Sequence, residues 1–108
     1  MSIVVTARGA GMGAWVDEDF AHCRQVVVVA ERGGFSAWEN PCRLDGRGAD
    51  LAMRILAEVK DIGALVTGSI DPDSLRLFSE REIPVYLAEK GAVLELVEAA
   101  GQGALPMA

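Results

Sequence analysis

The chain has 108 residues, of which 51% are hydrophobic and 24% are charged, so it can bury one core and has the composition of an ordinary folded domain. Its formal net charge of −6 argues against non-specific binding to nucleic acid or to an anionic membrane surface. No apolar run approaches the roughly 20 residues that span a bilayer, and the start lacks the basic segment of a signal peptide. We therefore expect a single domain over residues 1–108, located in the cytoplasm, where both cysteines would stay reduced.

The first half of the chain predicts one strand followed by a hairpin. Three segments have the composition of strands, and they cover residues 3–7, 25–31 and 35–39. A glycine-rich stretch over residues 8–13 follows the first of them. Turn chemistry at Arg32-Gly33-Gly34 connects the second to the third, and Pro41 ends the hairpin.

The second half alternates helical and strand-like patterns. Helical spacing or helix-start signals predict three helices, from Ala49 to a stop at Gly63, from Asp71-Pro72 through Phe78, and from Ala92 to a stop at Gly101. Strands are expected at residues 64–67 and 83–87. The order β-β-β-α-β-α-β-α predicts an α/β fold, a mixed five-stranded sheet with three helices packed on it. Its core spans about residues 2–101, and we expect a frayed tail over residues 102–108.

Five short motifs occur in a distinctive order. They are the acidic segment Glu18-Asp19-Phe20, the hairpin end Glu39-Asn40-Pro41, the loop Gly46-Arg47-Gly48-Ala49, the strand end Thr67-Gly68-Ser69-Ile70 and the later strand Ile83-Pro84-Val85-Tyr86. Together they resemble the dinitrogenase iron–molybdenum cofactor biosynthesis family, which includes NifX-type proteins, the NifB C-terminal domain and the orange molybdenum–copper protein type. The resemblance covers about residues 2–101. It implies a ribonuclease-H-like fold, and a shared fold does not imply nuclease activity.

Glycines and arginines in the loops are the candidate anion-binding groups. Glycine lets backbone N–H groups approach an anion closely, and arginine adds charge-assisted hydrogen bonds. The candidate cluster-binding residues of these two types are Arg8, Gly9, Gly11, Arg24, Arg43, Gly46, Arg47, Gly48 and Gly68. With the resemblance, they predict binding of a metal–sulfur cluster that contains molybdenum with copper or iron. The alternative is that these glycines only make turns and these arginines are only solvated.

Both cysteines and the single histidine, His22, are the candidate metal ligands. A hairpin turn centred on Arg32-Gly33 would place Cys23 opposite Cys42, whereas a turn at Gly33-Gly34 would pair Cys23 with Leu44. Two adjacent thiolates could hold a soft metal, with His22 adding an imidazole, or could form a disulfide. They could equally be small fillers of the core without chemistry.

Other patterns argue against catalysis. The carboxylates of residues 17–19 would alternate in direction rather than converge on one metal, and the GxGxxG spacing of a dinucleotide site is absent. Asp45 stands where many relatives keep a histidine, so ligation through that position does not carry over. The predicted function is a small non-catalytic carrier or accessory protein for a metal–sulfur cluster, with protein partners in cluster assembly or delivery. The alternative is an interaction or regulatory module of the same fold without a bound cofactor.

Overall fold

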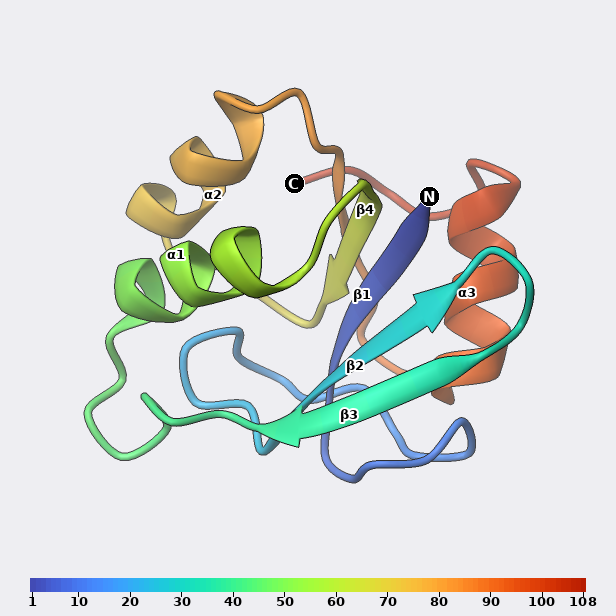
Figure 1. Ribbon diagram of the computed structural model, residues 1–108, viewed down its shortest axis with the longest axis horizontal. Coiled ribbons are helices and arrows are strands. Elements are labelled where there is room, and N and C mark those ends of the chain that lie inside the picture. Colours follow the sequence, from blue (N-terminus) through green and yellow to red (C-terminus); the bar gives the residue numbers. More distant parts are fainter.

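The computed structural model describes all 108 residues and has a mixed sheet with helices on both faces (Figure 1). The strands are β1 (Ser2–Ala7), β2 (Gln25–Ala30), β3 (Phe35–Glu39), β4 (Ile62–Thr67) and β5 (Val85–Leu87). The helices are α1 (Gly48–Glu58), α2 (Pro72–Ser79) and α3 (Val93–Gly101). The sheet order is β3-β2-β1-β4-β5, with β1 antiparallel to β2 and parallel to β4. The predicted α/β class, the five strands and the three helices are confirmed.

Two cores lie on opposite faces of the sheet, because successive strand residues point to alternate sides. α1 and α2 cover one face, where Phe20 meets Phe78 edge to face at a ring-centroid distance of 5.8 Å. α3 covers the other face, where it packs on Val5 and Val66. Coverage of both faces explains why the strands read as nearly continuous apolar runs. None of the three helices is long and apolar enough to span a bilayer.

Two predicted helix ends are wrong. α1 ends at Glu58, and Val59 is already extended with φ −107° and ψ 124°. Asp61, at φ 57°, then turns the chain into β4, so Gly63 is a strand residue rather than a helix stop. Ile62 fits the helical spacing, but it is the first residue of that strand. Gly101 is likewise the last residue of α3 and not the residue after it.

The end of the chain is not frayed, contrary to our expectation. The Leu87 N–H donates to the Pro106 carbonyl at 2.8 Å, and the Ala108 N–H donates to the Val85 carbonyl at 2.9 Å. Leu105 packs on the core under α3. The last residues therefore cover the outer edge of β5, which would otherwise expose unpaired backbone groups.

α2 begins as predicted, and a residue in the left-handed region follows its end. Asp71 caps the helix by accepting from the Ser74 N–H at 3.0 Å. At the other end the Ile83 and Glu82 N–H groups each donate at 3.0 Å, to the carbonyls of Phe78 and Ser79. This pair of bonds is a Schellman motif, and it holds Glu82 in the left-handed region at φ 58°.

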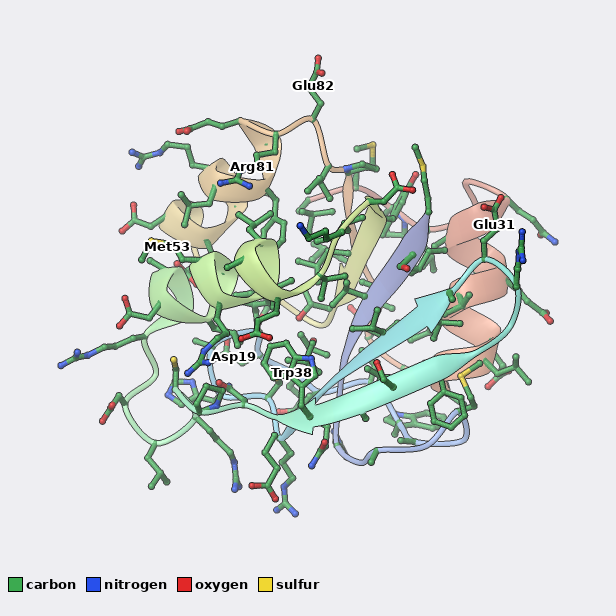
Figure 2. All side chains as sticks on the ribbon, in the orientation of Figure 1. Asp19, Glu31, Trp38, Met53, Arg81 and Glu82 are labelled. Atoms are coloured by element: carbon green, nitrogen blue, oxygen red, sulfur yellow. The ribbon has the colours of Figure 1, made fainter.

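Glu82→Gly is expected to raise the free energy of unfolding by about 0.5–1 kcal/mol, because glycine adopts the left-handed region without a Cβ clash. The Glu82 side chain extends into solvent, so its removal costs little packing (Figure 2). Urea unfolding followed by circular dichroism measures the change. Glu82→Ala is the control, since it keeps the Cβ and removes the charge. An equal gain in both variants would assign the effect to charge and contradict the backbone argument.

Candidate functional site

Four connecting segments meet at one end of the sheet, because the carboxyl ends of β1, β3, β4 and β5 all point there. They are residues 8–24, 40–47, 68–71 and 88–92. This loop end lies at the bottom of Figure 1. All the candidate site residues lie in these segments or at the start of α1, and the structure separates them into distinct groups.

The first group lines a cleft of about 560 Å³, which we call the arginine cleft. Its lining residues are Arg8, Arg24, Gln25, Glu39, Asn40, Pro41, Arg43, Leu44 and Asp45. The Arg8 guanidinium lies 3.4 Å from the Glu18 carboxylate, and both side chains are exposed. None of the ion pairs in the structure involves Arg24 or Arg43. The lining carries three arginines and two carboxylates, and Arg8 is paired with Glu18, so the guanidinium groups free of an ion pair in this cleft are those of Arg24 and Arg43.

The second group lines a separate cleft of about 520 Å³, which we call the acidic cleft. Gly46, Arg47 and Gly48 line this cleft and not the arginine cleft. Four aspartates share the lining, Asp19, Asp50, Asp71 and Asp73. Arg47 is 3.9 Å from one of them, Asp50. The charge of this cleft disfavours an anion. Six of the nine predicted anion-binding residues are thus divided between two separate clefts, and the other three, Gly9, Gly11 and Gly68, line neither.

Gly46 and Gly48 have a packing role that the sequence does not reveal. A Cβ on Gly46 would overlap the His22 imidazole, and Gly46 also has φ 63°. A Cβ on Gly48 would overlap the Asp71 carboxylate that caps α2. The close packing of this loop against its neighbours therefore explains why both positions are glycine, without any ligand.

The glycine-rich loop after β1, residues 8–13, lies against the start of α3. The Val93 and Leu94 N–H groups at the start of α3 each donate at 2.9 Å, to the carbonyls of Ala14 and Met12. These bonds satisfy helix N–H groups that have no partner inside the helix. Gly9 and Gly11 belong to this loop and do not line the arginine cleft. Gly68 packs against the carbonyls of Asp17 and Glu18.

The two cysteines are not paired across the hairpin. β2 pairs with β3 so that Gln25 lies opposite Glu39, and the same register places Cys23 opposite Pro41. Both expected pairings, with Cys42 and with Leu44, are wrong. The Ala30 N–H donates to the Gly34 carbonyl at 2.7 Å, so the hairpin has a three-residue loop, whereas both expected pairings require a two-residue turn.

Cys23 and Cys42 are both free thiols in different surroundings. Cys23 is fully buried in the core beneath α1 and α2, and this burial raises the pKa of its thiol to about 12. Cys42 is half-buried and packs against the edge of the same core. His22 is exposed in the acidic cleft, where Nδ1 hydrogen-bonds the Asp19 carboxylate. No group of three or more His, Cys, Asp and Glu side chains is arranged to hold a metal ion.

Only one thiol per chain is expected to react with an alkylating reagent at pH 8 in the native state. The thiolate is the nucleophile, and Cys23 is both inaccessible and protonated, so the modified residue should be Cys42. Mass spectrometry before and after unfolding in guanidinium gives the count and the site. Cys42→Ser should be unlabelled until it unfolds. Rapid native labelling of Cys23 would contradict its assignment to the core.

Asn40 is the residue whose importance sequence reasoning missed. It is 6% exposed, and its side chain makes hydrogen bonds with both loops that form the arginine cleft. In the sequence, Asn40 stands out only as part of the motif Glu39-Asn40-Pro41. The sequence does contain a signal for this role, because Asn40 is a polar residue between the end of a predicted strand and Pro41. The chain must turn there, and a side-chain amide can satisfy the backbone groups of the turn.

The fold and the cleft define a small α/β protein with an arginine-lined recess at the loop end of its sheet. The chain belongs to the dinitrogenase iron-molybdenum cofactor family, whose model matches residues 1–103. This confirms the resemblance seen in the motifs. A comparison with curated proteins finds no match.

Solved structures show the same fold. The apo form of the orange protein from Desulfovibrio gigas is 29% identical, with a TM-score of 0.85 over 99% of this chain and 92% of that one. A candidate NifB protein from Thermotoga is 19% identical, with a TM-score of 0.80 over 98% and 91% of the two chains. A candidate dinitrogenase from Methanocaldococcus jannaschii is 16% identical, with a TM-score of 0.69 over 100% and 94%. The last two similarities establish the fold alone.

Proposed function

We propose that this chain is a small non-catalytic carrier or accessory protein that binds a metal–sulfur cluster as an anion in the arginine cleft. Membership of the cofactor family and the likeness to the orange protein support a role connected with cofactor biosynthesis. They also make molybdenum the first metal to test, with copper or iron as its companion. The partners would be the proteins that assemble or receive the cluster, in a reducing cytoplasm that suits two free thiols.

A single observation carries this proposal, the meeting of Arg8, Arg24 and Arg43 in one cleft of an acidic protein. Arg8 and Arg24 lie at the two ends of the 8–24 segment, and Arg43 lies in the 40–47 segment. Arg24 and Arg43 have no carboxylate partner, so their guanidinium groups remain available to a ligand. The volume of about 560 Å³ falls in the range of small-molecule sites.

The chemistry of a thiometallate fits such a cleft. The anion carries its own sulfide ligands, so it requires positive charge and N–H donors rather than a full set of protein ligands. Guanidinium groups supply both in a planar, fixed arrangement. Gly9, Gly11, Gly46, Arg47, Gly48 and Gly68 lie outside the arginine cleft, and we do not include them in the proposed site. Of the predicted metal ligands, only Cys42 is both accessible and next to cleft residues.

The test is reconstitution with tetrathiomolybdate and copper. We expect a visible charge-transfer band and bound molybdenum that survive desalting. Arg24→Ala and Arg43→Ala should each weaken binding at least about tenfold, since a hydrogen bond to a charged group contributes about 1.5–3 kcal/mol. Binding should also weaken as salt is added. Cys42→Ser tests whether a protein sulfur joins the cluster.

Arg81→Ala is the matched control. Arg81 is exposed just after α2, far from the loop end, so its removal changes net charge equally without touching the cleft (Figure 2). An effect of Arg81→Ala equal to that of Arg24→Ala would indicate non-specific attraction. If the wild-type chain retains no metal after desalting, the carrier proposal fails and the interaction module without a cofactor is favoured.

A further inference from the structure

The backbone of Asn40 joins the two loops that carry the unpaired arginines. Its N–H donates to the Arg24 carbonyl at 3.1 Å, and its carbonyl accepts from the Arg43 N–H at 3.4 Å. Arg24 is also fixed from the other side, because its N–H donates to the Asp17 carboxylate at 3.0 Å. The position of Arg43 relative to Arg24 therefore depends on how rigidly Asn40 is held.

The side chain of Asn40 supplies that rigidity. Its Nδ2 donates to the carbonyls of Ala21 at 2.9 Å and Cys23 at 3.0 Å, and it lies 3.7 Å from the Cys23 Sγ. Its Oδ1 accepts from the Cys42 N–H at 2.8 Å. A short amide provides two donors and an acceptor at once, whereas an ionised aspartate has no donor. The buried amide thus ties the end of the 8–24 segment to the start of the 40–47 segment.

We infer that Asn40 is a positioning residue that fixes Arg43 relative to Arg24 and thereby sets the affinity of the arginine cleft for its anion. This inference rests on the proposed function for its ligand. Asn40 does not need to touch the anion, because its polar atoms are engaged with the protein. Asn40 therefore affects the affinity for the anion only through the guanidinium groups of Arg24 and Arg43. A residue that bound the anion directly, or that only stabilised the fold, would affect the affinity whether or not those two groups were present.

A double-mutant cycle tests the dependence with tetrathiomolybdate as the ligand. Asn40→Ala should raise the dissociation constant about tenfold in the wild-type background. In the Arg24→Ala/Arg43→Ala background the same change should alter it less than about twofold, since the groups it positions are gone. An undiminished effect in that background would overturn the inference.

Leu96→Ala is the control for a loss of stability alone. Leu96 is a buried residue of α3, on the opposite face of the sheet. All dissociation constants are measured at a temperature where urea curves show each variant fully folded. Leu96→Ala should then leave the dissociation constant unchanged. If it weakens binding as much as Asn40→Ala does, the role of Asn40 is merely structural and the inference is overturned.

Hydrogen exchange gives a readout that needs no ligand. The Gly46 N–H donates to the Cys42 carbonyl at 3.0 Å within the 40–47 segment, so its exchange rate reports on the order of that loop. In Asn40→Ala the Gly46 and Arg43 amides should exchange at least about tenfold faster than expected from the change in global stability. If the wild-type chain binds no tetrathiomolybdate, the proposed function fails and this measurement alone decides whether Asn40 orders the loop. Unchanged exchange at Gly46 would overturn the inference.

Discussion

Phe20→Ala is expected to lower the free energy of unfolding by about 3–5 kcal/mol, a large part of the stability of a domain of this size. Phe20 is fully buried, and its ring meets Phe78 of α2 edge to face. Its backbone N–H also donates to the Ser69 carbonyl at 2.9 Å, which connects the 8–24 segment to the loop after β4. Truncation would open a cavity between the sheet and α2 and would remove the aromatic pair.

Phe20→Leu is the matched variant, because it keeps most of the apolar volume without the aromatic ring. We expect it to cost about 1.5 kcal/mol, between a well-tolerated hydrophobic swap and the full truncation. Urea unfolding followed by circular dichroism gives both values. A cost below about 1 kcal/mol for Phe20→Ala would show that the 8–24 segment is not anchored through this ring.

Much of the fold could be predicted from the sequence, because strong local signals agreed with the packing. Continuous apolar runs indicated strands covered on both faces, and Asp71-Pro72 marked a helix start that the structure confirms. Errors arose where two patterns overlap. Ile62 satisfies the helical spacing of α1 but begins β4, and the periodicity alone cannot separate these cases. The last residues looked unstructured because their contribution is backbone pairing with β5, which leaves no trace in composition.

The candidate site was predicted less completely. Arg8, Arg24 and Arg43 meet because of the topology, since each lies near the end of a strand and all three strand ends are at the loop end of the sheet. The separation of Arg47 from them depends on how the 40–47 segment folds onto its neighbours. The cysteine pairing depended on the length of a single hairpin loop, and a shift of one residue removed it.

Gly68→Ala is expected to lower the free energy of unfolding by about 2–3 kcal/mol, because the added Cβ has no room to move. It would lie 2.5 Å from the Asp17 carbonyl oxygen and 2.6 Å from the Glu18 carbonyl oxygen. Both obstacles are backbone atoms, and hydrogen bonds hold them in place. The Gly68 N–H donates to the Asp17 carbonyl at 3.1 Å, and the Ser69 hydroxyl donates to the Glu18 carbonyl at 2.7 Å.

Gly11→Ala is the control, since no heavy atom lies within 4 Å of its Cβ position and its φ is outside the left-handed region. It should change the free energy of unfolding by less than about 0.5 kcal/mol. A similar cost in both variants would mean that backbone flexibility, not the close contact at Gly68, is being measured.

The close contact at Gly68 also connects stability to the arginine cleft, because the Asp17 carboxylate accepts from the Arg24 N–H at 3.0 Å. A displaced Asp17 should move Arg24, so folded Gly68→Ala protein should bind tetrathiomolybdate more weakly, whereas Gly11→Ala should bind it as the wild-type chain does.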